Sequence, residues 1–298
     1  MNKKIFYLFF LTFLLIPITQ ANDVNVGLYL INLGKFDVST GAFTADFYLS
    51  LKCEEVNCTV GDFEFLNGRA TSVDKNIDTK TEKFYRIQGN FVSPVDLREY
   101  PFDNQKMQII LEDKLNTVDK INYVPNNEYS DVDESIVFTG WNLESWNTNV
   151  TTHYYKPYDE TYSQYIFDVN ISRIRLNSFF KTFLPIIFIM LITVFTFVID
   201  PDKITNRITI AGSSLVGAVM FHISISNQIP PVGYLTIADK FMMLTYFVLV
   251  ITFLINIILL ELSEKKKTVQ VEKLHRLTEY NMLWLVPVLY LIFFMFVL

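Results

Sequence analysis

Cysteines and histidines, the residues most often used for redox and metal chemistry, are scarce in this sequence. The chain contains two cysteines, Cys53 and Cys58, and three histidines. In an exported domain a C-x4-C pair most often forms a short disulfide, so we expect these cysteines to close one loop. Metal binding by the pair is the weaker alternative, because no histidine lies near it in the sequence. We therefore expect no metal site.

The sequence also lacks the common catalytic motifs. It has no nucleophile motif, no H-E-x-x-H zinc motif, no glycine-rich phosphate loop and no pair of carboxylates at a defined spacing. We expect no enzymatic activity, no cofactor and no nucleic-acid partner.

A more informative pattern lies in an apolar segment at about 208–226. Spacings that alternate between four and three place residues on one face of a helix. The members of this stripe are Thr209, Ser213, Val216, Met220, Ile223 and Asn227. Around a symmetry axis, rings of hydroxyls can replace part of an ion's hydration, and aliphatic rings can close a pore by dewetting. The alternative is a buried helix whose hydroxyls bond its own backbone, and the pattern alone does not decide between the two.

The segments that would position this stripe are four apolar stretches in the second half of the chain. The sequence is 51% hydrophobic and has a mean hydropathy of +0.27, which is too apolar for an ordinary soluble domain. The stretches lie at about 177–199, 208–226, 236–260 and 280–298. Each is near the ~20 residues that cross a hydrocarbon core. We expect residues 177–298 to form a four-helix transmembrane domain.

Residues 1–21 have the layout of a cleaved secretory signal peptide, with lysines, then an apolar run, then small residues. A fifth membrane helix is the alternative for this segment. A cleaved signal would place residues 22–176 outside the cytoplasm and segment 262–279 inside. The basic residues in that segment agree with this orientation: Lys265, Lys266, Lys267, Lys273 and Arg276. We expect a multi-pass protein in contact with the lipid of the cell membrane, with its first domain on the external or periplasmic side.

Residues 22–176 have the pattern of a β-domain. Apolar and polar residues alternate along 24–30, 43–51, 107–111 and 165–171, and turn residues separate such runs. Many short strands at this spacing predict an all-β, immunoglobulin-like sandwich. The domain carries 24 Asp and Glu against 14 Lys and Arg, so it should attract cations.

Several motifs, in order along the chain, resemble those of the pentameric ligand-gated ion channels, the Cys-loop receptors and their prokaryotic proton-gated relatives. They are Tyr100-Pro101-Phe102-Asp103-x-Gln105, Phe138-Thr139-Gly140-Trp141, Ile171-Ser172-Arg173, Pro185, Pro230-Pro231-Val232-Gly233-Tyr234-Leu235-Thr236 and Asp239. The resemblance implies an extracellular ligand-binding β-sandwich on a four-helix membrane bundle, with five identical copies around a central pore. It implies a ligand-gated channel for small ions. A membrane-anchored sensor or binding protein without conduction is the alternative.

The chain departs from this family at several positions. Ser93 and Met107 stand where animal receptors carry the cysteines that bracket the Pro-Phe-Asp loop, so the disulfide that names those receptors is absent. The Trp-x-Pro signature of the early strands is also missing. Part of the usual agonist pocket therefore differs here.

The resemblance also implies which residues couple the two domains. It places Asp103 against Arg173 at the domain boundary, with Asp37 as a candidate third member. From the residues alone, Arg173 would instead be read as a side chain reaching the membrane interface. Pro101 and Phe102 would press on the segment 230–234, so that rotation of the sandwich moves the outer end of the pore helix. The full set is Asp37, Pro101, Phe102, Asp103, Arg173, Pro230, Pro231 and Tyr234.

The ligand is the least determined part of the prediction. Tyrosines crowd the loop near residues 153–164, and an aromatic wall suits an organic cation. The acidic domain could instead titrate and respond to protons or divalent cations. The candidate ligand-binding residues are Glu112, Asp113, Tyr154, Tyr155, Tyr158 and Tyr162.

Ion selectivity is also open. Thr205 and Asn206 stand where cation-selective relatives usually carry a glutamate. The acidic first domain, together with Asp200 and Asp202, nevertheless favours cations.

Overall fold

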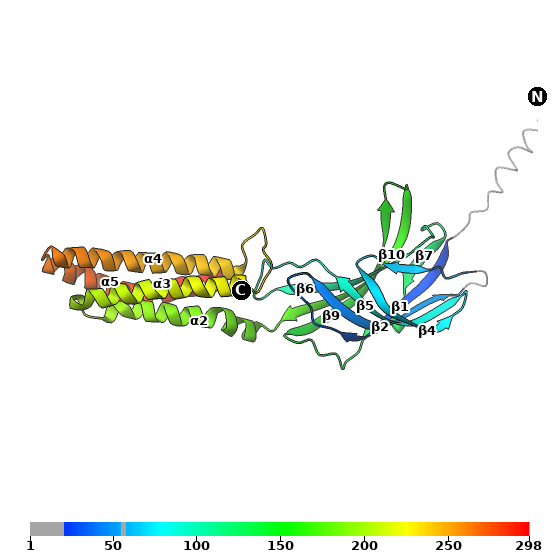
Figure 1. Ribbon diagram of the computed structural model, residues 1–298, viewed down its shortest axis with the longest axis horizontal. Coiled ribbons are helices and arrows are strands. Elements are labelled where there is room, and N and C mark those ends of the chain that lie inside the picture. The colour runs from blue at the N-terminus through cyan, green and yellow to red at the C-terminus, as the bar shows by residue number, and fades with distance from the viewer. Residues whose placement is uncertain (1–20, 55–57, 298) are drawn as a thin grey trace, which may run out of the picture.

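The computed structural model describes residues 21–54 and 58–297 and has two parts (Figure 1). A β-domain forms one end of an elongated molecule, and four long helices lie side by side at the other. The predicted signal peptide, residues 1–21, lies outside the described residues except for Ala21.

The β-domain is a sandwich of two sheets. One sheet has the order β4-β5-β2-β1-β7, with β8 paired to β1, and the other has the order β3-β6-β10-β9. Neighbouring strands are antiparallel, except that β7 and β8 run parallel to β1. The strands are β1 (Asn22–Leu33), β2 (Ala42–Cys53), β3 (Phe63–Phe65), β4 (Gly68–Asp78), β5 (Glu82–Val92), β6 (Asn104–Asp113), β7 (Ile121–Pro125), β8 (Asp131–Val132), β9 (Trp141–Tyr155) and β10 (Glu160–Arg173).

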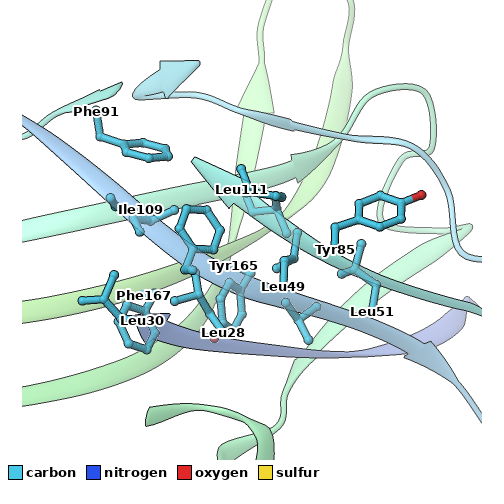
Figure 2. Close-up of a cluster of buried hydrophobic side chains, with 14 of the residues drawn as sticks. Leu28, Leu30, Leu49, Leu51, Tyr85, Phe91, Ile109, Leu111, Tyr165 and Phe167 are labelled. Atoms are coloured by element: carbon cyan, nitrogen blue, oxygen red, sulfur yellow. The ribbon is translucent and has the colours of Figure 1, made fainter. Parts of the chain in front are cut away.

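The core of the sandwich follows from the alternation in the sequence. Every second residue of a strand points to the same face, and these residues meet between the two sheets (Figure 2). Leu28 and Leu30 of β1 lie opposite Tyr165 and Phe167 of β10, and all four are buried. Each such side chain contributes roughly 1.5–3 kcal/mol through burial. The predicted β-sandwich is confirmed.

The second part consists of α2 (Arg175–Phe195), α3 (Ile204–Ser226), α4 (Ile237–Glu264) and α5 (Thr268–Val297). Short 3-10 turns, η2 (Thr196–Val198) and η3 (Pro201–Lys203), connect α2 to α3. All four helices are long and apolar enough to cross a membrane. The predicted bundle of four membrane helices is therefore confirmed, and α5 ends next to the β-domain.

The helix ends differ from the predicted spans. The segment 262–279, expected to be a cytoplasmic connection, is almost entirely helical, and only residues 265–267 form a turn between α4 and α5. Where the helices extend past their apolar stretches, charged residues one turn apart pair with each other, an arrangement that favours a helix surface. Glu261 pairs with Lys265 at 2.6 Å, and Glu272 pairs with Arg276 at 2.5 Å.

Candidate functional site

The six residues of the predicted stripe all face away from the other helices of the chain. Val216, Met220 and Ile223 are 62%, 63% and 50% exposed, and the three polar members of the stripe are exposed as well. The opposite face of α3 is buried against α2 and α4: Ile204, Arg207, Ala211, Ser214, Ala218 and Ile225. Among the described residues, the stripe is thus not buried against its own neighbouring helices.

Arg173, the last residue of β10, bonds to Asp103 where the β-domain meets the helices. The Nε atom of Arg173 donates to Oδ1 of Asp103 at 2.6 Å, and its backbone N–H donates to the Asp103 carbonyl at 3.2 Å. The Asp103 side chain is 1% exposed, and Gln105 donates to its other oxygen at 2.6 Å. A carboxylate buried this fully needs such partners. Arg173 is therefore part of a polar cluster and does not simply reach the membrane interface.

Two aromatic rings cover the guanidinium of Arg173. The ring centroid of Trp141 lies 4.4 Å from its Cζ atom, and that of Tyr100 lies 5.1 Å away. Both distances are within cation–π range. The sequence marked Trp141 only as part of the motif Phe138-Thr139-Gly140-Trp141. Its place opposite Arg173 depends on the pairing of β9 with β10, which no local pattern reveals.

Asp37, the predicted third member, is not part of this cluster. Its carboxylate accepts from the hydroxyl and backbone N–H of Ser39 at 2.7 and 2.9 Å, and from the hydroxyl of Thr40 at 2.9 Å. These bonds, led by the one from the Ser39 hydroxyl, lower the pKa of Asp37. An aspartate in a tight turn bonds nearby backbone and hydroxyl groups in preference to distant ones. The same connection instead contacts the cluster through Phe36, whose ring lies edge-on to Trp141 at 6.0 Å.

The turn that precedes β6 contacts the connection between α3 and α4, as predicted, through Tyr234 of the predicted set and through Leu97 and Tyr100, which were not in that set. The backbone N–H of Leu97 donates to the Tyr234 hydroxyl at 2.8 Å, and that of Ala238 donates to the Tyr100 carbonyl at 3.1 Å. The residues of the connection that pack against Leu97 and Tyr100 are Ile229, Val232 and Tyr234.

Phe102 turns toward the first membrane helix rather than toward segment 230–234. Its ring stacks on Phe183 of α2 with 5.8 Å between the centroids. Tyr100 and Phe102 stand on either side of Pro101 in the turn and point to different neighbours. The prediction that Phe102 presses on the connection between α3 and α4 is therefore wrong in its choice of aromatic residue.

Three of the six candidate ligand-binding residues come together where the hairpin of β9 and β10 passes the end of β6. The Tyr155 hydroxyl donates to Oε2 of Glu112 at 3.1 Å, and the ring of Tyr162 packs edge-on against Tyr155. His153 also belongs to this cluster, because its Nδ1 lies 2.8 Å from Oε1 of Glu112. Burial and the bond to Glu112 raise the pKa of Tyr155 to about 12, so its hydroxyl remains a donor at physiological pH.

The other three candidates lie elsewhere. Tyr154 and Tyr158 are exposed. Tyr154 points away because successive strand residues face opposite sides. Asp113 accepts from the backbone N–H groups of Leu115 and Asn116 and so shapes the turn after β6. The same period of two that places Tyr155 in the cluster also places His153 there, and this was the signal that could have identified it.

The cysteines play no part in these clusters. Cys53, at the end of β2, forms a disulfide with Cys58, and both side chains are buried. Within residues 21–54 and 58–297 no group of three or more His, Cys, Asp or Glu side chains could hold a metal ion.

Comparison with known proteins agrees with this geometry. No protein-family model matches the chain. A proton-gated ion channel of Gloeobacter violaceus is 24% identical to it in an alignment of 250 residues that covers 75% of this chain and 68% of that protein. The chain thus resembles the pentameric ligand-gated ion channels in sequence and in its β-sandwich followed by four membrane helices. It is a multi-pass membrane protein whose β-domain is extracellular.

Proposed function

Starting from this resemblance to the pentameric ligand-gated ion channels, we propose that the chain is one of five identical subunits of a channel opened by an extracellular ligand. The observation that carries the proposal is the outward-facing stripe of α3. Exposed Val216 and Met220 would be ordinary against lipid, but exposed Ser213 and Asn227 on the same face would not. Polar groups in hydrocarbon lack partners. Five copies of the stripe around a common axis would place these polar side chains in a water-filled pore, where water can hydrogen-bond to them.

The proposed pore is polar at its cytoplasmic end and mainly apolar farther out. Rings of Thr209 and Ser213 line the inner part, Val216, Met220 and Ile223 form constrictions, and Asn227 lies at the outer end. Thr209 donates its hydroxyl to the backbone carbonyl of Thr205 at 2.9 Å. A hydroxyl that donates in this way keeps its oxygen lone pairs free to coordinate a cation.

We propose that the channel selects cations. Asp200 and Asp202 are exposed at the cytoplasmic end of α3. Arg207 is buried, and it donates to the backbone carbonyl of Phe197 at 2.8 Å. Arg207, in the first turn of α3, is thus turned away from the proposed pore, and the acidic extracellular domain concentrates cations at the other end.

We propose external protons as the ligand, because the relative from Gloeobacter violaceus is named a proton-gated ion channel. The buried Glu112 beside His153 supports this choice. Histidine is the side chain that changes charge between pH 5 and 8. A small organic cation held by Tyr155 and Tyr162 is the alternative ligand. His153→Gln, which keeps a polar side chain but does not titrate, should weaken gating by protons and leave gating by an organic cation intact.

The energy needed for gating is modest. Moving a channel from about 1% to about 99% open requires roughly 10⁴-fold tighter total binding to the open state. Shared among five sites, this is about sixfold per site, or about 1.1 kcal/mol. One hydrogen bond or cation–π contact per subunit supplies this. The cluster around Arg173 and the contact of Tyr100 with the connection after α3 would carry the change to the pore.

Current recording from the purified full-length chain in lipid bilayers tests the proposal. We expect currents that grow as external pH falls, a reversal potential near that of potassium in asymmetric potassium chloride, and a particle mass of five chains. A reversal potential near that of chloride would overturn cation selectivity alone. An intact pentamer that passes no current under every ligand and pH would favour the membrane-anchored sensor.

A further inference from the structure

Arg207 is the largest side chain that is completely buried in the described part of the chain. It lies in the first turn of α3, at the cytoplasmic end of the bundle. Its Nε donates to the Ile199 carbonyl at 3.0 Å, and its Nη2 donates to the Phe197 carbonyl at 2.8 Å. The guanidinium thus ties the start of α3 to the end of the preceding membrane segment.

The same Nη2 atom also reaches α5, where it lies 3.0 Å from Nδ1 of His275. Arginine carries only donors and keeps its charge throughout the physiological range. Nδ1 must therefore accept, which requires a neutral imidazole with its proton on Nε2. Nε2 faces Glu279, whose Oε2 is 3.9 Å away, and the His275 side chain is only 13% exposed. The position of Arg207 thus determines both the charge and the tautomer of His275.

The charged groups around His275 come from three elements: Arg207 on α3, Glu279 on α5 and Asp200 in the connection between α2 and α3. Apolar side chains close the cytoplasmic ends of α3, α4 and α5 next to this group: Ile204, Leu259, Val271 and Leu274. The Nη1 atom of Arg207 is buried and has no hydrogen-bond partner among the described residues. Loss of the His275 acceptor would therefore remove a further hydrogen bond from the Arg207 guanidinium. Hydrogen bonds missing from a buried charge cost free energy.

We propose that His275 senses protons from the cytoplasmic side and, through Arg207, sets how firmly the inner end of α3 is held. Protonation places a hydrogen on Nδ1, so the acceptor is lost and two positive charges face each other at 3.0 Å. The imidazolium then turns toward Glu279, and Arg207 keeps only its two carbonyl partners. The contact between α5 and the start of α3 is released.

The effect on current rests on the proposed function, whereas the protonation chemistry does not. A helix end with fewer contacts resists movement less, so cytoplasmic acid should make the channel easier to open. We expect the external stimulus for half-maximal current to fall about fivefold, the lower end of the usual range for coupled sites.

Inside-out membrane patches test this effect. The pipette fixes the external stimulus, and the bath pH is lowered from about 7.5 to about 5, across the range in which histidines titrate. His275→Gln retains an oxygen that can accept from Arg207 but cannot titrate, so it should respond to the external stimulus and ignore bath pH. Glu279→Gln removes the carboxylate that receives the imidazolium and should move the response to lower bath pH. A wild-type current that ignores bath pH, or a response that survives in His275→Gln, overturns the inference.

A second measurement needs no current. The chain has three histidines, so the nitrogen-15 resonances that disappear from histidine-labelled protein in His275→Gln belong to His275. We expect Nδ1 without a proton at neutral pH, and protons on both nitrogens in acid. A proton on Nδ1 at neutral pH overturns the inference even in a protein that conducts. The expected tautomer and acid transition in a protein that passes no current would support the sensor and contradict the proposed function.

Discussion

The indole ring of Trp141 covers the guanidinium of Arg173, with 4.4 Å between the ring centroid and Cζ. The two residues are paired across β9 and β10, so the register of these strands sets the contact. Phe36, from the first strand connection, packs against the same indole. Arg173 is thus bonded to a carboxylate and covered by aromatic rings, and the two kinds of contact can be altered separately.

Trp141→Phe should preserve gating better than Trp141→Leu. Phenylalanine keeps an aromatic face for Arg173, whereas leucine removes it and with it about 0.5–2 kcal/mol of cation–π attraction. We expect the external stimulus for half-maximal current to change little in Trp141→Phe and several-fold in Trp141→Leu. Equal effects of the two substitutions would mean that Trp141 acts through its volume alone.

Arg173→Gln should destabilise the protein more than Asp103→Asn. Arg173→Gln leaves a carboxylate that is 1% exposed without its cation, a change that typically costs about 3–5 kcal/mol. Asp103→Asn leaves a partly exposed guanidinium that still contacts Trp141 and Tyr100. Denaturant unfolding followed by tryptophan fluorescence measures both variants. In the double variant the cost should be smaller than the sum, and strict additivity would show that the pair is not coupled.

Single cysteines along the stripe should react with water-soluble thiol reagents when the channel is open. The positions are Thr209, Ser213, Val216, Met220 and Ile223. Ala211, Ser214 and Ala218 serve as matched controls because they lie on the buried face of α3. The two native cysteines form a disulfide, so background labelling should be low. Preferential labelling of the control positions would refute the assignment of the stripe to the pore.

Val216→Ser should increase current at rest. A hydroxyl ring holds water where an aliphatic ring excludes it, so the constriction should close less completely. Val219→Ser is the matched control, since Val219 is exposed on α3 but lies off the stripe. Resting currents that match in the two variants would exclude Val216 as the constriction.

Acid should weaken the β-domain through Asp46. Arg86 donates two hydrogen bonds to this carboxylate, at 3.1 and 2.8 Å, and they lower the pKa of Asp46. The pKa of Asp46 is lower in the folded protein than in the unfolded chain, where it is ~3.9. The ion pair therefore contributes its full stabilisation above pH ~3.9, and this contribution is lost as the pH falls through the pKa of the folded state. Asp46→Asn should reduce the free energy of unfolding at neutral pH and flatten its fall in acid.

The control for that experiment is Glu134→Gln, which changes an exposed carboxylate outside the strands. Denaturant unfolding at several pH values measures both variants. Proton gating near neutral pH should be unchanged in Asp46→Asn, because Asp46 stays ionised there. A large shift in gating would show that Asp46 takes part in proton sensing.

Much of the architecture could be predicted from local patterns. The alternation in β1 and β10 determined which side chains enter the core, and the apolar stretches identified four membrane helices, because both patterns depend only on residues within one element and on the solvent around it. The same reasoning predicted the stripe on α3. Hydropathy alone did not give the start of α5 at Thr268. It identifies the stretch that suits a membrane, whereas a helix extends as far as its backbone hydrogen bonds continue.

Contacts between distant elements were decided only by the tertiary structure. The pairing of Arg173 with Asp103 was predicted from a family resemblance. The third contact of this pair is made by Trp141 and not by Asp37, and Tyr100 rather than Phe102 contacts the connection between α3 and α4. The period of two along β9 puts His153 on the same face as Tyr155, but only the pairing of β6 with β10 and β10 with β9 brings that face to Glu112. His275 beside Arg207 had no signal in the spacing of residues along the chain. Such contacts depend on strand register and on how helices are oriented toward one another, and these are set by the packing of the whole molecule rather than by any single segment.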